Sequence, residues 1–155
     1  MNVVGRQAVS ISYKGGYKYQ LFRTHWERLL DKPPIPWDQD EEGKLVPRLQ
    51  CGPYLKIKEG GELWIAKGYC WDGPSGPTWD TGTFMRGSLV HDALYQFIRN
   101  KLLLEDPWRE YADDLLKKIC KEDGMSAFRA WYVHKSVRGF GSCAVQHPRE
   151  AMIAP

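Results

Sequence analysis

The stretch "RGSLVHDALYQFIRN", residues 86–100, places a histidine and an aspartate side by side inside an apolar run. We predict that it belongs to a helix over about Phe84–Asn100, with Thr83 as the N-cap. Residues four apart share a helix face, so His91 and Tyr95 lie one turn apart, whereas Asp92 points about 100° away. His91 therefore faces one pocket, and Asp92 faces whatever lies upstream.

Two more helices are expected after this one. The second begins at Asp106, is followed by a proline at the first helical position, and runs to about Asp123. The third begins after Ser126 and ends at Gly139 or Gly141, because glycine commonly follows the last helical residue. Short connections make the first two helices antiparallel neighbours.

The first third of the chain has the pattern of strands. "QAVSISY" (7–13) alternates apolar and polar residues, "YKYQLF" (17–22) follows a Gly-Gly turn, and "YLKIKEGGELWIA" (54–66) is a hairpin with two glycines at its tip. The proline-rich and acidic "DKPPIPWDQDEEGK" (31–44) is predicted to be an exposed loop. "GYCWDGPSGPTWDTGT" (68–83) has no periodicity and predicts an ordered, irregular loop.

These elements define the expected fold class as α+β: an N-terminal antiparallel sheet with a hairpin, a Gly/Pro-rich ordered loop, and a three-helix C-terminal half with an antiparallel helix pair. The 155 residues suit a single domain. Within it we expect residues 1–67 to be mainly β, 68–83 a loop, 84–141 helical and 142–155 a tail.

Composition narrows the possible functions. Hydrophobic residues make up 43% and charged residues 26%, so the chain is globular, and a net charge of +3 without a dense basic run gives no reason to expect nucleic acid as a partner. The aromatic residues (7 Trp, 8 Tyr, 5 Phe) suit either a small core filled with large side chains or an apolar–polar boundary such as a membrane surface. We expect neither a signal peptide nor a transmembrane segment. The four cysteines, which form no zinc-binding spacing, are expected to be free thiols.

The helix after residue 106 carries "YADDLL", in which Asp113 lies among apolar neighbours. An unpaired buried carboxylate would cost several kcal/mol, so Asp113 needs a partner. His91 on the neighbouring helix is the candidate, and a carboxylate on one ring nitrogen would make the other nitrogen a general base. The alternative is that His91 is a satisfied core histidine and that Asp92 only bonds to backbone.

The loop before the first helix suggests a metal. A Gly/Pro-rich loop leaves its carbonyls outside any ladder, and carbonyls with a carboxylate are the hard oxygen ligands that calcium takes. Asp92 would supply the carboxylate, and Asp72 and Asp80 could add charge.

Two resemblances follow from these motifs. "WDGPSGPTWDTGTFMRGSLVHDALYQFIR", "YADDLL" and "EDGMSAFRAWYVHKSVRGFG" resemble a family of phage and prophage proteins catalogued as a domain of unknown function, number thirteen fifty-three. That resemblance covers about residues 65–141 and implies a bacteriophage origin. The protein would then be made in the host cytoplasm and could be virion-associated.

The more distant resemblance is to phospholipase A2. His-Asp-x-x-Tyr after a Gly-rich loop is similar to the active site of the secreted enzymes and of parvovirus capsid phospholipase domains. By that resemblance His91 is the base, Asp113 orients it, Tyr95 braces Asp113 and Asp92 binds calcium. The family's loop has the pattern Tyr-x-Gly-x-Gly, whereas this chain has Tyr-Cys-Trp-Asp-Gly. The loop residues that the resemblance assigns to calcium are Tyr69, Asp72 and Gly73.

Three functions therefore remain open. The first is a calcium-dependent lipid ester hydrolase, whose partner is a phospholipid or membrane surface. The second is a non-enzymatic phage virion, tail or host-interaction protein, whose partners are other phage structural proteins. The third is a metal-dependent His-Asp phosphohydrolase, which needs further histidine ligands, and His25, His134 and His147 show no metal spacing.

Overall fold

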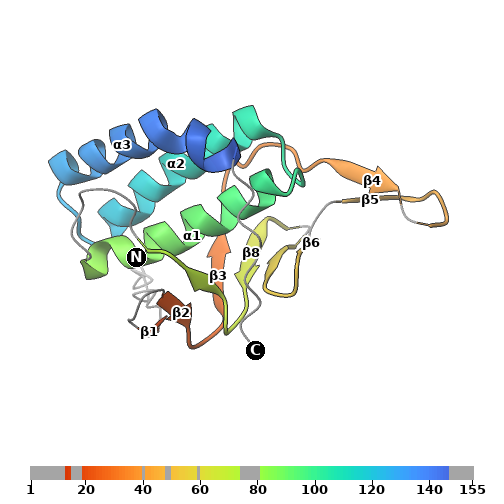
Figure 1. The fold of residues 1–155 in the computed structure, drawn as a ribbon, viewed down its shortest axis with the longest axis horizontal. Coiled ribbons are helices and arrows are strands. Elements are labelled where there is room, and N and C mark those ends of the chain that lie inside the picture. Colours follow the sequence, from red (N-terminus) through yellow and green to blue (C-terminus); the bar gives the residue numbers. More distant parts are fainter. Residues whose placement is uncertain are drawn as a thin grey trace, which may run out of the picture.

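The computed structural model describes residues 13–14, 19–39, 41–47, 50–58, 60–73 and 81–146. Antiparallel strands form two sheets and a separate two-stranded ribbon, and three helices follow them in the chain. Figure 1 shows the helices side by side above the strands. The α+β class and the order of its parts are as predicted.

The larger sheet has four strands in the order β3-β8-β7-β6. β7 and β8 form the predicted hairpin, in which Leu55 is opposite Ile65 and Gly61 takes a positive φ of 80° near the tip. The bounds of the four strands are β3 His25–Arg28, β6 Gln50–Cys51, β7 Leu55–Ile57 and β8 Glu62–Ile65. Along β7 and β8 alternate side chains are buried against the helices, as a half-buried sheet requires.

The smaller sheet includes a strand from the segment 68–83, which was predicted to be an irregular loop. Its strands are β1 Tyr13–Lys14, β2 Tyr19–Leu21 and β9 Cys70–Trp71, with β2 in the centre. β9 lies within the segment 68–83 that was predicted to contain no strand, since pairing with the distant β2 overrides local composition. Residues 74–80 lie outside the described residues, as do residues 7–12 of the first predicted strand.

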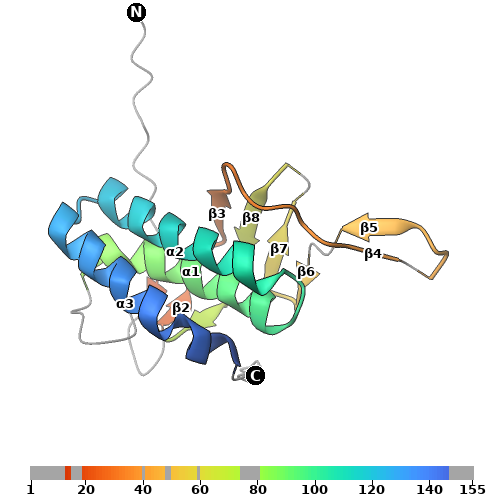
Figure 2. The same cartoon turned by 90° about the horizontal axis from the view of Figure 1, so that it is seen from above.

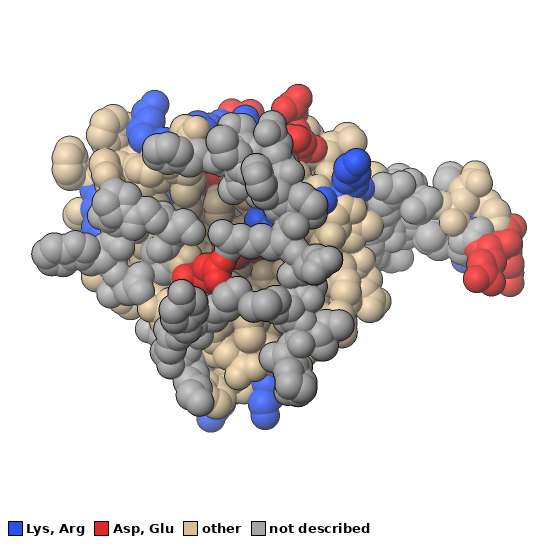
Figure 3. All heavy atoms as spheres, in the orientation of Figure 1, with Lys and Arg blue, Asp and Glu red and all other residues tan. Residues whose placement is uncertain are grey.

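The proline-rich segment is also different from its prediction. β4 (Trp37–Gln39) pairs antiparallel with β5 (Leu45–Pro47), so part of the expected loop 31–44 is one strand of a hairpin. The three prolines precede β4 and do not interrupt its ladder, which explains why a strand is possible there. Figure 1 shows the hairpin projecting from the rest of the molecule, and Figure 3 shows acidic side chains at its tip.

The helices α1 (Gly82–Arg99), α2 (Glu105–Glu122) and α3 (Ala127–Gln146) lie close to the predicted positions. The N-cap of α1 is Thr81 rather than Thr83, and the N-cap of α2 is Leu104 rather than Asp106. Asp106 instead lies in the first turn of α2, where its charge favours the positive end of the helix dipole.

α3 is longer than predicted. It continues through Gly139 and Gly141 to Gln146, so the expected stop was wrong and the tail begins later than residue 142. A glycine inside a helix costs only about 1 kcal/mol relative to alanine, which is not enough to end a helix whose other residues favour it. The nearest proline after it is Pro148.

α1 is the central element of the core. Its side chains Leu89, Leu94 and Phe97 are fully buried in one cluster with Leu63 and Ile65 of the sheet. α2 closes the opposite side of α1 and runs antiparallel to it, and α3 packs on α2 (Figure 2). Because α1 is surrounded in this way, each polar side chain on it needs a partner inside the protein.

Close packing between α1 and α2 depends on Gly87. A Cβ at this position would lie 2.8 Å from the Cys120 Sγ and 2.9 Å from the Leu116 Cδ1. We expect Gly87→Ala to lower the free energy of unfolding by about 1–2 kcal/mol despite the better helix propensity of alanine. Gly139→Ala is the matched control, since nothing lies within 4 Å of its added Cβ, and it should not destabilise. Urea unfolding of both variants tests this, and equal stabilities would contradict it.

Candidate functional site

The helix pair brings together the three side chains that the sequence singled out. His91 Nε2 lies 2.9 Å from Asp113 Oδ1, and the Tyr95 hydroxyl donates to the same oxygen at 2.8 Å. The rings of His91 and Tyr95 are 4.1 Å apart, as their one-turn spacing on α1 predicts. The expected contact between histidine and the distant aspartate is therefore present.

Asp113 is completely buried, with 0% of its side chain exposed. Its second oxygen, Oδ2, lies 3.3 Å from Arg138 Nε on α3. This distance is that of an ion pair, but the geometry is not that of a hydrogen bond, and neither atom has a hydrogen-bond partner. A charged guanidinium beside a buried carboxylate compensates part of the cost of its desolvation.

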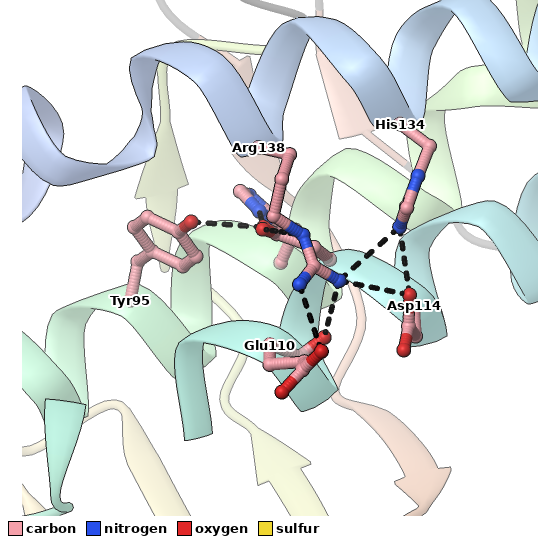
Figure 4. A network of polar contacts seen from close by, with 7 residues as sticks. Tyr95, Glu110, Asp114, His134 and Arg138 are labelled. Carbon is pink, nitrogen blue, oxygen red and sulfur yellow. Dashed lines mark hydrogen bonds and ion pairs between the residues drawn. The ribbon is translucent and has the colours of Figure 1, made fainter. Parts of the chain in front are cut away.

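Arg138 joins this pair to the surface of α2 and α3, and the sequence analysis missed it. Its guanidinium also contacts Glu110 and Asp114 at 3.0 Å each, and His134 lies 2.7 Å from Asp114 (Figure 4). Burial alone would lower the pKa of Arg138, but the hydrogen bond to Glu110 and the nearby carboxylates raise it. Glu110 and Asp114 are four residues apart on α2, and His134 and Arg138 are four residues apart on α3. An acidic pair and a basic pair with the same helical spacing are a signal in the sequence that could have predicted the contact between these two helices.

Tyr95 is a hydrogen-bond donor in this arrangement and not a base. Burial is the main cause that raises the pKa of its hydroxyl, and the charge of Asp113 raises it further. The hydroxyl therefore keeps its proton and donates a hydrogen bond to Asp113 Oδ1, the oxygen that also faces His91. This is the bracing role that the phospholipase resemblance implies.

His91 has one ring nitrogen engaged and one available. Its Nε2 faces Asp113, whereas its Nδ1 has no hydrogen-bond partner among the described residues. The side chain is 11% exposed, so the imidazole is largely buried and still in contact with solvent. When Nε2–H donates to the carboxylate, the lone pair is on Nδ1, which is then free to accept a proton.

Asp92 points away from His91 and is half-buried on α1. No hydrogen bond or ion pair reaches its carboxylate from the described part of the chain. Burial raises its pKa, and the electrostatic effects of His91 and Arg99 offset this only in part. A desolvated carboxylate without a partner is a plausible cation ligand on chemical grounds.

Tyr69, the next expected calcium ligand, is already engaged. Its backbone carbonyl accepts a hydrogen bond from the Leu21 amide at 2.8 Å, and its buried hydroxyl donates to Gln96 Oε1 at 3.0 Å. Burial and the charge of Asp92 raise the pKa of this hydroxyl, so Tyr69 lies near Asp92 and stays neutral. Only the second lone pair of its carbonyl remains for a metal ion.

Of the remaining loop residues that were expected to bind calcium, the structure describes Asp72 and Gly73. Asp72 is exposed, and Gly73 is buried with a φ of 75°, and a Cβ at this position would collide with the Tyr19 ring. Trp71 just before them donates from its indole to Ser88 Oγ at 3.1 Å, which fixes the start of the loop on α1. Asp80 lies outside the described residues. Within the described ranges no three His, Cys, Asp or Glu side chains form a group able to hold a metal ion.

A second buried polar cluster is structural. Arg86 on α1 pairs with Glu27 on β3 at 3.2 Å and with Asp123 at the end of α2 at 2.9 Å. His25 Nε2 lies 3.3 Å from Glu27, which accounts for this buried histidine without a metal. The cluster connects the sheet to both central helices, and its one guanidinium is shared by the carboxylates of Glu27, Glu122 and Asp123. Of the cysteines in the described ranges, Cys51, Cys70 and Cys120 are free thiols, as expected.

Comparison with known proteins identifies no relative of this chain. No protein-family model matches the chain, and no curated protein or solved structure matches it significantly. Across the described helices, none is both long enough and apolar enough to cross a membrane. The fold and the contacts define an α+β protein whose α1–α2 pair buries a His–Asp–Tyr network.

Proposed function

We propose that the protein is a hydrolase of lipid esters that works as phospholipase A2 does, with His91 as the general base. The observation that carries this proposal is the state of His91. One ring nitrogen is held by a buried carboxylate, and the other has no partner within the described ranges, on a side chain that reaches solvent. This arrangement suits proton transfer from a water molecule.

Each residue of the network has one task in this reaction. His91 Nδ1 takes a proton from water as the water oxygen attacks the ester carbonyl, and the resulting imidazolium is stabilised by Asp113. Tyr95 and Arg138 hold the two oxygens of Asp113, so that the carboxylate stays correctly turned toward His91. As the ester bond breaks, His91 returns the proton to the departing alcohol oxygen. A fatty acid and a lysophospholipid are the products.

Calcium is the metal that we propose for this site. Asp92 would hold it with oxygen atoms of Asp72 and Gly73, and the half-buried Asp92 carboxylate, to which no hydrogen bond or ion pair comes from the described residues, supports this choice. A bound calcium ion polarises an ester carbonyl and stabilises negative charge on its oxygen. Tyr69, Asp72 and Gly73 are the other ligands expected from the resemblance, and Asp72 is the one that could add charge.

Fatty-acid release from phospholipid vesicles tests the proposed function. The purified chain should release fatty acid from mixed phosphatidylcholine and phosphatidylglycerol vesicles in calcium and should lose that activity in excess EDTA. Magnesium is the control, because it is smaller and demands stricter octahedral geometry than calcium. Absence of release in calcium, with folded protein and a secreted phospholipase A2 as positive control, would overturn the proposal.

Replacing Asp92 tests the metal ligand without an activity assay. The raised pKa of Asp92 means that its ionised form opposes folding, so stability falls as the pH rises above the unfolded value of about 3.9. We therefore expect Asp92→Asn to raise the Tm at pH 7 in EDTA, by about 2–4 °C for each kcal/mol recovered. Calcium should raise the Tm of the wild type and leave Asp92→Asn unchanged. Equal calcium shifts in both proteins would exclude Asp92 as a ligand.

A second candidate is a phage virion, tail or host-interaction protein without catalysis. Both oxygens of Asp113 are already engaged within the protein, and a closed network of this kind also suits a role in stability alone. The projecting β4–β5 hairpin, with exposed Glu41 and Glu42 between its strands, would suit contact with other phage structural proteins. No observation favours the phosphohydrolase, since His25 and His134 are paired with Glu27 and Asp114.

A further inference from the structure

The outer face of α3 carries aromatic side chains that the core does not use. Phe128, Trp131 and Tyr132 are 78%, 48% and 41% exposed, and the rings of Phe128 and Trp131 stack 6.1 Å apart. Spacings of three and four residues place them on one side of the helix, together with exposed Lys135. The opposite side of α3, with Ala130 and Val133, is buried on α2. Three neighbouring exposed aromatic rings form a patch that usually marks an interaction site.

The adjacent face of α2 is basic. Lys117, Lys118 and Lys121 line a hollow of about 530 Å³ together with Asp114 and Glu122. In the described structure none of these three lysines forms an ion pair, nor does Lys135 on α3. The positive charge of the lysines is therefore uncompensated.

The two acids of this hollow each have a cationic partner within the protein. Asp114 is paired with His134 and Arg138, and Glu122 is paired with Arg86. Both guanidinium groups are shared with further carboxylates, so the lysines are the groups of this surface that are left for a partner. A partner that is complementary to these lysines is negatively charged.

The basic and aromatic groups belong to one surface. α2 and α3 are antiparallel, and the contacts of His134 with Asp114 and of Arg138 with Glu110 fix their register. Moving back along α3 by one turn and forward along α2 by the same amount places Trp131 at the level of Lys117. The exposed rings of α3 therefore lie on the helix next to the hollow, which is itself lined by residues of α2.

We propose that this aromatic–basic face of α2 and α3 docks on an anionic phospholipid bilayer. Trp and Tyr favour the boundary between hydrocarbon and water, Phe inserts among the acyl chains, and lysines attract anionic headgroups. Each ring that leaves water contributes to binding, and the lysines select the negatively charged surface. The inference deepens the proposed lipid hydrolase and rests on it for its biological role, since the face would bring the protein to its substrate.

Vesicle cosedimentation in EDTA tests docking apart from catalysis. The wild type should bind phosphatidylcholine–phosphatidylglycerol vesicles, bind phosphatidylcholine alone at least tenfold more weakly, and lose affinity as salt is raised. Trp131→Ser should weaken binding to anionic vesicles about tenfold or more. Trp26→Ser is the matched control, because Trp26 is 50% exposed on β3, and its affinity should stay at the wild-type value.

Three results of binding and size measurements would overturn docking. The first is the absence of binding to anionic vesicles, and the second is an equal loss of affinity in the Trp131 and Trp26 variants. The third is a wild-type protein that elutes as a dimer in size-exclusion chromatography while Trp131→Ser elutes as a monomer. A dimer would mean that a second copy covers the face.

Hydrolysis of a short-chain lipid dissolved as monomers separates docking from the proposed function. Trp131→Ser should keep the wild-type rate on that substrate and lose activity only on vesicles. Binding without any hydrolysis would overturn the proposed function and support docking, whereas equal hydrolysis of vesicles by both proteins would overturn docking alone.

Discussion

His91→Ala should lower calcium-dependent fatty-acid release by about 10²–10⁴-fold, the usual contribution of a positioned general base. The variant should remain folded, because His91 is at the edge of the network and reaches solvent, while Tyr95 and Arg138 still hold Asp113. Initial rates on phospholipid vesicles measure the effect, and circular dichroism with thermal unfolding measures the fold.

His134→Ala is the matched control for that experiment. His134 also pairs with an aspartate across two helices, at 2.7 Å from Asp114, but that aspartate is exposed. The proposed reaction therefore predicts wild-type rates for the control. Unfolding of His91→Ala would favour the structural role of the cluster, and equal losses in the two histidine variants would remove His91 from the mechanism.

The His91–Tyr95–Asp113 contact could be predicted because two local rules suffice for it. The four-residue spacing in α1 places histidine and tyrosine on one face, and a carboxylate among the apolar residues of α2 must find a partner inside. A short connection between the helices then leaves few other ways to pair them. The contact among these three side chains therefore follows from sequence features within α1 and α2.

The two strands and the arginine that the sequence analysis missed depend on contacts between residues far apart in the sequence. β9 is a strand because it meets β2, about fifty residues earlier, and its own Gly/Pro-rich surroundings give no strand signal. β4 likewise needs β5 as its partner. Arg138 lies on α3 in a stretch that ends, by local rules, at Gly139. Its contact with Asp113 follows only from the way α3 packs on α2.

The burial of Asp113 lowers the stability of the fold but favours the proposed chemistry. A buried carboxylate is costly, and the protein offsets this cost with a hydroxyl and an imidazole from α1 and a guanidinium from α3. The same three contacts fix the position of the carboxylate that would orient His91. A substitution that keeps the shape of Asp113 but removes its charge should therefore separate the two roles.

Asp113→Ala should be the most destabilising change at this site. It leaves the Tyr95 hydroxyl and the His91 Nε2 without their acceptor and removes the buried counter-ion of Arg138, and loss of one partner of a buried pair costs about 3–5 kcal/mol. Urea unfolding should therefore show a much lower free energy of unfolding than for the wild type. Asp114→Ala, at the adjacent exposed carboxylate, is the control and should cost no more than about 1 kcal/mol.

Asp113→Asn distinguishes catalysis from structure at the same position. The amide oxygen can still accept the hydrogen bond from Tyr95, so we expect folded protein with a smaller loss of stability than in Asp113→Ala. A neutral amide cannot stabilise an imidazolium, and loss of the orienting aspartate in His–Asp systems costs about 10⁴ in kcat. Fatty-acid release should accordingly fall by several orders of magnitude while the fold is retained. If folded Asp113→Asn releases fatty acid at the wild-type rate, Asp113 has no part in the reaction and the network is structural.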